Sequence, residues 1–384
     1  MSSNTTVFDE YRTTLESHGA DGLLELLEEQ FRAAGRFHEL FEVLKMQARR
    51  SLKLPLVADE RLEDLEEQLR ATLEDRLLEA CRVVGTLLME AGKLREGWLY
   101  LRPLADRKTA QKFLLQTEVN DQNLDELIEL SLGEGIAPAF GYELMLNEFG
   151  TCNSITAFET QVRQLPRADQ RACARLLVQH LHAELLTNVR GDVENRVGSR
   201  VEGDTIAALI ADRDWLFGDM SYHIDTTHLA SVVRFARICD DPEVLRLALD
   251  LCEYGARLNE RFQFESEEPF QPMYAASRMF FAMLVGQDIE AGLKFFRDKA
   301  DATDVYHQGS APAEVYIDLL ARTGRHALAA EYLIQKLPPG TRTQGIAPTL
   351  FELCRAMNNF RPMLAICEEK DDRLGFATAL ICES

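Results

Sequence analysis

The sequence predicts an all-α protein built from stacked antiparallel helical hairpins. Apolar residues recur at three- and four-residue steps, as in the series Leu62, Leu65, Leu69, Leu73 and Leu77. This spacing places them on one face of a helix. Alternating apolar and polar residues, the pattern of a half-buried strand, are nearly absent. The third observation is a repeated unit in which an apolar helix ends at a turn residue and a second amphipathic helix follows at once.

Turn residues mark the hairpins in order along the chain. The predicted helix pairs are 23–34 and 37–47 around Gly35, 82–91 and 94–104 around Gly92, 228–239 and 244–254 around Asp240, Asp241 and Pro242, 274–285 and 289–296 around Gly286, 313–323 and 327–337 around Gly324, and 349–357 and 362–368 around Asn358 and Asn359. Glycine accepts the left-handed conformation that ends many helices, and asparagine is the next most tolerant residue. We therefore expect Gly92, Gly286 and Gly324 to have positive φ.

Three of these turns resemble the inter-helix turn of tetratricopeptide repeats. They are Ala-Gly-Lys-Leu-Arg-Glu-Gly-Trp at 91–98, Gly-Gln-Asp-Ile-Glu-Ala at 286–291 and Thr-Gly-Arg-His-Ala-Leu-Ala-Ala at 323–330. A small residue lies five positions after the turn glycine and a larger apolar residue follows it: Gly97 and Leu101, Ala291 and Phe295, Ala329 and Leu333. In that family the small residue lets the paired helices approach closely. The first-helix signature is not kept, so the resemblance implies a degenerate tetratricopeptide-like α-solenoid and no subfamily.

The chain divides by pattern into three segments. Residues 1–105 are expected to form N-terminal hairpins, 106–227 an irregular helical region, and 228–384 a C-terminal repeat array. The central segment contains a loop-like stretch at 188–203, which is rich in Gly, Asn, Asp and Arg. It also contains Asn153 and Ser154, either of which is a suitable N-cap for a helix beginning at Ile155.

The net charge and the cysteine spacing indicate which classes of partner and which cellular compartment to expect. The chain has 63 acidic and 42 basic residues and a net charge of −21. This charge repels phosphate backbones and anionic lipids, so nucleic acid and membrane are not expected partners. None of the eight cysteines forms a Cys-x-x-Cys pair, and no signal peptide or membrane-length apolar run is present, which together predict a cytoplasmic protein.

Motifs that specify a reaction are absent. The chain has no dinucleotide fingerprint, no Gly-x-x-x-x-Gly-Lys loop, no His-Glu-x-x-His and no Gly-x-Ser-x-Gly. The glycines of Gly133-Glu-Gly135 have no strand before them and are interpreted as turn residues.

One stretch, 214–228, could carry a metal. Its candidate ligands are Asp219, His223, Asp225 and His228. Two histidines and a carboxylate are the minimum set for iron, manganese or zinc with open positions, and a helix start at Asp225 would let the chain bend so that both imidazoles reach one ion. The structural alternative is that Asp225 or Thr226 caps the following helix, while Tyr222, His223 and Trp215 pack as partly buried residues with a hydrogen-bonded polar end. Both interpretations stay open at this point.

Two classes of function follow. The first is a protein- or peptide-binding helical-repeat module that acts as a scaffold or adaptor. The second is a metal-dependent enzyme in which His223, Asp225 and His228 hold a divalent metal and Asp219 orients a histidine. The binding module is favoured because the repeats are the only signal seen more than once. Arg234 and Arg237, on the helix that begins near His228, are expected to be solvated or paired with acids.

Overall fold

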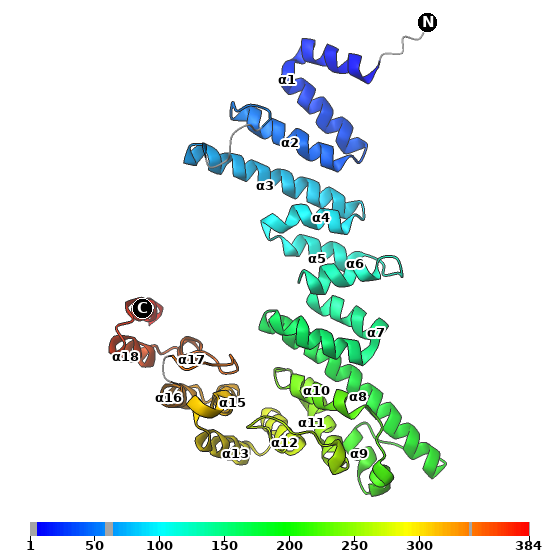
Figure 1. The fold of residues 1–384 in the computed structure, drawn as a ribbon, viewed down its shortest axis with the longest axis vertical. Coiled ribbons are helices and arrows are strands. Elements are labelled where there is room, and N and C mark those ends of the chain that lie inside the picture. Colours follow the sequence, from blue (N-terminus) through cyan, green and yellow to red (C-terminus); the bar gives the residue numbers. More distant parts are fainter. Residues whose placement is uncertain (1–5, 58–63, 338–339, 384) are drawn as a thin grey trace. The chain divides into compact units, whose positions relative to one another are not determined.

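All the regular structure is helical in the part of the chain that the structure describes. The computed structural model describes residues 6–57, 64–337 and 340–383 (Figure 1). The prediction of an all-α protein is therefore confirmed. By its internal contacts the chain divides into two compact units, Met1–Asn147 and Glu148–Ser384. The division falls inside the segment predicted at 106–227.

The N-terminal unit is a succession of helices, of which α1 to α5 each pack against the next. Helices α1 and α2, α2 and α3, α3 and α4, and α4 and α5 are in contact, and their order in space follows their order in the chain (Figure 1). The elements are α1 (Val7–Ala33), α2 (Phe37–Ser51), α3 (Glu67–Glu90), α4 (Leu94–Leu101), η2 (Arg102–Leu104), α5 (Arg107–Gln116), α6 (Leu124–Ile128), η3 (Glu129–Gly133) and the first part of α7 (Pro138–Thr160).

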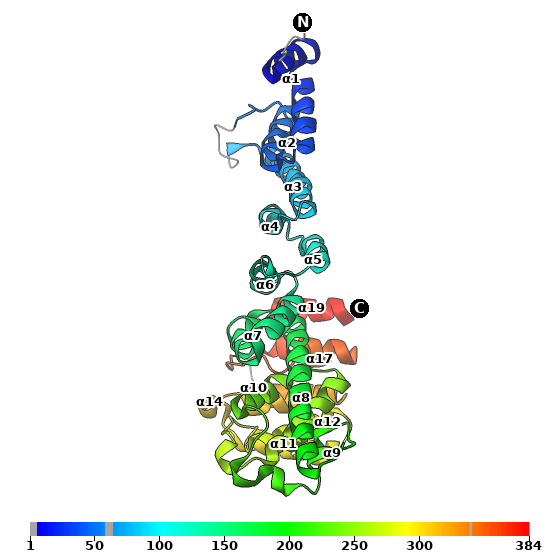
Figure 2. The ribbon, with the colours of Figure 1, turned by 90° about the vertical axis from the view of Figure 1, so that its right-hand side faces the viewer.

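The C-terminal unit is organised around the long helix α8, which packs against α10 and α11 (Figure 2). From α11 onward, most successive helices again pack in pairs. The elements after α7 are η4 (Val162–Gln164), α8 (Arg167–Val197), α9 (Ile206–Ile210), η5 (Asp214–Met220), α10 (Thr226–Ala236), α11 (Pro242–Arg257), η6 (Glu260–Phe262), α12 (Met273–Leu284), α13 (Ile289–Ala302), α14 (Val305–Gln308), α15 (Ala311–Arg322), α16 (His326–Lys336), α17 (Leu350–Met357), α18 (Arg361–Glu369) and α19 (Arg373–Glu383).

The predicted hairpin turns are confirmed. Gly92, Gly286 and Gly324 have φ of 75°, 89° and 78°, and each lies between two helices that pack on one another. Asn358 ends α17 with φ of 50°, and Asp241 caps α11 with Pro242 in its first turn. Local chemistry was sufficient for these predictions because a turn residue acts on its own backbone.

The small residue of the hairpin holds its predicted place in two of the three cases. Gly97 and Ala329 are buried. The expectation for Ala291 is wrong, since Ala291 is exposed and Gly292 packs beside Met283 instead. The reason is an extra turn residue: Asp288, with φ of 46°, precedes α13, whereas α4 begins two positions after Gly92. The buried aromatic residue shifts likewise from Phe295 to Phe296.

Three local predictions differ from the structure. The helix expected from Leu62 begins at Glu67, and Leu62 itself lies outside the described residues. The stretch predicted as a loop at 188–203 is helical as far as Val197. The break in α7 is at Gly150, with φ of 74°, rather than at a cap at Asn153 or Ser154. Glycine is the residue that adopts this φ without strain.

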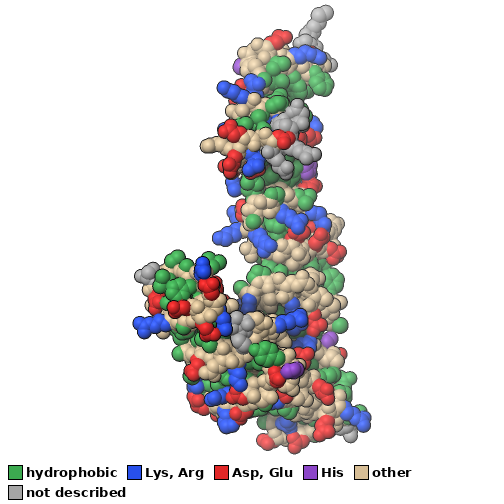
Figure 3. Space-filling model, turned by 60° about the vertical axis from the view of Figure 1, so that its left-hand side comes forward, with side chains coloured by type: hydrophobic (Ala, Val, Ile, Leu, Met, Phe, Trp, Pro, Cys, Tyr) green, Lys and Arg blue, Asp and Glu red, His purple; other side chains and the backbone are tan. Residues whose placement is uncertain are grey.

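Charged side chains of both signs are interspersed on the face drawn in Figure 3. Among the described residues, no helix is both long enough and apolar enough to span a bilayer.

Two glycines should respond in opposite directions to the same substitution. Gly324→Ala should lower the free energy of unfolding by about 1 kcal/mol, because alanine is strained at positive φ. Gly191→Ala should raise it by about 1 kcal/mol, because Gly191 is inside α8 and an added Cβ meets no atom within 4 Å. Urea unfolding of both variants measures the difference. Equal effects would show that the backbone at Gly324 is not constrained as described.

Candidate functional site

His223 lies just before α10 and contacts side chains of two other helices. Its Nε2 is 3.2 Å from Oδ2 of Asp192 in α8, and its Nδ1 is 3.0 Å from Oη of Tyr254 in α11. The backbone N–H of His223 donates to the same hydroxyl at 2.8 Å. The hydroxyl proton is then available to Nδ1, which assigns the imidazole proton to Nε2, toward Asp192. Burial raises the pKa of Tyr254 to about 12, so the phenol stays protonated at neutral pH.

Asp225 is the N-cap of α10, as the structural alternative predicted. Its Oδ1 accepts the backbone N–H groups of Thr227 and His228 at 2.8 and 3.2 Å. Hydrogen bonds from the Thr227 side chain and from these two backbone groups lower the pKa of Asp225. The carboxylate is thus ionised at neutral pH and stabilises the helix start.

The predicted metal site is not assembled from the described side chains alone. Within the described residues, no three His, Cys, Asp or Glu side chains are grouped so that they could hold a metal ion. The imidazole of His228 forms no hydrogen bond with another described residue. The side chain of Asp219 lies outside the described part of the structure. The metal site of Asp219, His223, Asp225 and His228 therefore stays a prediction.

Replacing the two histidines separately tests their roles. His223→Ala should lower the free energy of unfolding by about 1–3 kcal/mol, because it removes the ring's hydrogen bonds with the Tyr254 hydroxyl and with Asp192 Oδ2. His228→Ala, which removes no hydrogen bond of the ring, should change it by less than about 0.5 kcal/mol. Thermal unfolding and elemental analysis of the wild type provide the readouts. Bound iron, manganese or zinc that both substitutions remove would support the metal site instead.

A pocket of about 1250 Å³ opens beside α10 in the C-terminal unit. One wall is a single face of α10 together with the two residues that follow it. Its pocket-lining residues recur at helical spacing: Thr227, Ala230, Ser231, Arg234, Arg237 and Ile238. A second wall is a face of α15, which contributes Ala311, Val315 and Asp318. The remaining lining residues come from η4, the start of α8, helix α12 and the segments 264–270 and 344–346.

Two arginines from other helices fix the end of α10. Nη1 of Arg322 donates to the carbonyl of Arg237 at 2.9 Å, and Nη2 donates to the carbonyl of Cys239. Nε of Arg171 donates to the carbonyl of Ile238 at 3.0 Å. These carbonyls have no partner within the helix, so the arginines satisfy them and hold the pocket wall in place.

The arginines of the α10 face have different partners. Arg234 pairs with Glu159 at 2.6 Å, as the sequence predicted. Arg237 does not follow that prediction: its guanidinium lies 3.4 Å from the centroid of the Phe270 ring and donates to the Ser277 hydroxyl at 3.0 Å. Burial lowers the pKa of Arg237 to about 9, which still leaves it charged at neutral pH.

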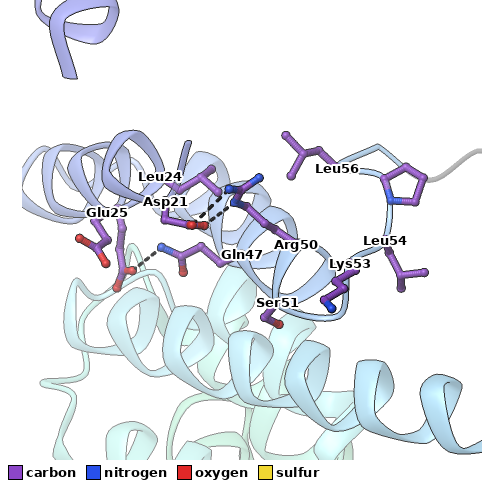
Figure 4. Close-up of a pocket in the computed structure, with 11 residues that line it drawn as sticks. Asp21, Leu24, Glu25, Gln47, Arg50, Ser51, Lys53, Leu54 and Leu56 are labelled. Atoms are coloured by element: carbon purple, nitrogen blue, oxygen red, sulfur yellow. Dashed lines mark hydrogen bonds and ion pairs between the residues drawn. The ribbon is translucent and has the colours of Figure 1, made fainter. Parts of the chain in front are cut away.

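A second pocket, of about 940 Å³, lies in the N-terminal unit beside α1, α2 and the segment that follows α2 (Figure 4). Its arginine is already neutralised, since Arg50 donates from Nη2 to Oδ2 of Asp21 at 3.2 Å. Gln47 donates to Oε2 of Glu28 at 2.9 Å across the same pocket. The Arg50 and Gln47 side chains are thus already bound to carboxylates, so this pocket is the weaker candidate.

Comparison with known proteins adds no relative. No family model matches the chain, and neither a curated protein nor a solved structure matches it. The pocket beside α10 is therefore the feature of this chain that points to a function. The sequence signal that could have found this wall was the three- and four-residue recurrence from Thr227 to Arg237, in which small residues are followed by two arginines.

Proposed function

We propose that the protein is a tetratricopeptide-like helical scaffold that binds an extended peptide segment of a partner protein in the pocket beside α10. The proposal joins the repeated hairpins, whose turns have the expected conformation, to a pocket that lies among several of the helices. Helical-repeat proteins commonly bind peptides on surfaces made by successive helices.

The observation that carries the proposal is the size and the lining of the pocket. Its volume of about 1250 Å³ exceeds the roughly 300–1,000 Å³ of most small-molecule sites. Apolar side chains of Phe264, Phe270, Met273 and Phe280 lie beside arginines in its lining. Aromatic and arginine anchors are the residue types that supply most of the binding energy at protein interfaces.

Filling the pocket tests the proposal. Peptides selected on the purified protein from a random-peptide display library should bind Ala230→Trp at least about tenfold more weakly than wild type, because the indole would occupy the space beside α10. Ala183→Trp is the matched control, since Ala183 is an exposed residue of α8 outside the lining. Fluorescence anisotropy with labelled peptide measures both affinities. Enrichment of no peptide, or equal binding by both variants, would contradict the proposal.

A further inference from the structure

Arg237 is a cation in the pocket lining without a carboxylate partner among the described residues. Its single side-chain hydrogen bond goes to the neutral hydroxyl of Ser277 at 3.0 Å, and its Nε is buried and forms no hydrogen bond. The ring of Phe270 covers one side of the guanidinium at 3.4 Å. A cation–π contact and one neutral acceptor offset only part of the cost of removing a guanidinium from water.

Two further arginines line the same pocket without an acid partner. Arg167 donates from Nη1 to the carbonyls of Gly345 and Ile346 at 3.0 and 3.3 Å, and its Nε is buried with no hydrogen bond. Arg163 is exposed and forms no ion pair with a described residue. Three guanidinium groups, from η4, α8 and the C-cap of α10, thus line the pocket without a direct ion pair to a described carboxylate, in a chain whose net charge is −21.

The described carboxylates of the pocket form no ion pair with these arginines. Asp318 pairs with Arg322 at 3.4 Å, and Glu268 pairs with Lys299 at 2.8 Å. Glu265 and Glu267 are exposed residues of the segment between η6 and α12, and neither forms an ion pair with a described residue. Among the described residues, therefore, no carboxylate forms an ion pair with Arg237.

From this arrangement we infer that the pocket binds an anionic group of the peptide ligand, a carboxylate or a phosphoryl group, against Arg237 with Arg167 and Arg163 beside it. The inference rests on the proposed function and specifies the chemistry of the ligand. A guanidinium donates two parallel hydrogen bonds to either kind of oxyanion, and such charge-assisted bonds are roughly twice as strong as neutral ones. Ser277 and Phe270 would hold the guanidinium in position for this contact.

The test pairs a change in the ligand with a change in the protein. Selected peptides should share an acidic position, and replacing that Asp or Glu by its amide should weaken binding to wild type at least about tenfold. The acid-to-amide ratio should fall toward one in Arg237→Met. It should stay near the wild-type ratio in Arg234→Met, because Arg234 lies on the same face of α10 and already pairs with Glu159. A ratio that is unchanged in Arg237→Met would overturn the inference.

Two further arms identify the anion and separate the two proposals. A peptide with phosphoserine at the acidic position identifies the anion. Tighter binding than the carboxylate peptide assigns the site to a phosphoryl group, and weaker binding assigns it to a carboxylate.

If no peptide is enriched, the proposed function fails, and binding of inorganic phosphate then tests the anion site separately. A rise in melting temperature with phosphate in wild type but not in Arg237→Met would support the anion site, and no rise would overturn it. Arg167→Met repeats the comparison if Arg237→Met does not fold.

Discussion

Asp250→Ala is expected to lower the free energy of unfolding by about 3–5 kcal/mol, because it leaves several buried donors without an acceptor. Asp250 is a buried residue of α11, and its carboxylate accepts three hydrogen bonds. Its Oδ2 lies 2.7 Å from Nε2 of the buried His182 and accepts the backbone N–H of Ile206 at 2.7 Å. Its Oδ1 accepts the N–H of Ala207 at 2.8 Å. One side chain thus joins α8 and α11 and caps the start of α9.

Asp241→Ala is the matched control for this substitution. Asp241 is an exposed N-cap of α11 that accepts one backbone hydrogen bond, from Glu243 at 2.9 Å. Its removal should lower the free energy of unfolding by about 1 kcal/mol, the usual effect of losing a cap. Urea unfolding followed by circular dichroism compares the two variants. Similar losses in both would show that burial of the Asp250 contacts adds nothing to an ordinary cap.

Local signals predicted the turns and the cap of α10 because each depends on a few consecutive residues. Glycine at a helix end and aspartate before a helix act on the backbone beside them. The prediction of a loop at 188–203 was wrong because it relied on the polar composition of the segment and disregarded its helical periodicity. The polar residues there are the outer face of α8, whereas Leu181, Leu185, Val189 and Val193 recur every four residues on its buried face. That spacing was present in the sequence and could have extended the helix.

The contacts that form the sites could not be predicted from the sequence, because they join residues that are far apart in the chain. His223 was selected as a metal ligand from its neighbours, but its hydrogen-bond partners Asp192 and Tyr254 lie on two other helices. His182 could be placed on a helix, yet nothing in its surroundings indicated Asp250. Arg237 looked like Arg234 in the sequence, and only the packing of α10 against neighbouring elements separates the paired arginine from the unpaired one. Spacing along one helix specifies a face and leaves the opposing surface undetermined.

Gly97→Val should lower the free energy of unfolding by about 1–3 kcal/mol or more, because it adds atoms where two backbones already touch. A Cβ at Gly97 would lie 2.8 Å from Cγ of Met89 and 2.9 Å from the carbonyl oxygen of Gly85 in α3. A side chain such as that of Met89 can move by changing rotamer, but the Gly85 carbonyl can yield only if α3 and α4 separate. Such a separation would also disturb Leu101, a fully buried residue of α4 that lies against Gly85.

The control for this substitution is Gly191→Val, which places the same side chain in the open space beside α8. Valine and glycine have comparably low helix propensities, so its effect should be within about 0.5 kcal/mol. Thermal unfolding of both variants separates the close approach of the helices from the backbone effect of replacing a glycine. A stable Gly97→Val protein would mean that α3 and α4 do not need a small residue where they cross. The main physical reason for likening this hairpin to a tetratricopeptide repeat would then be lost. Destabilisation of Gly97→Val but not of Gly191→Val would show that the small residue at this crossing sets the spacing of the hairpin.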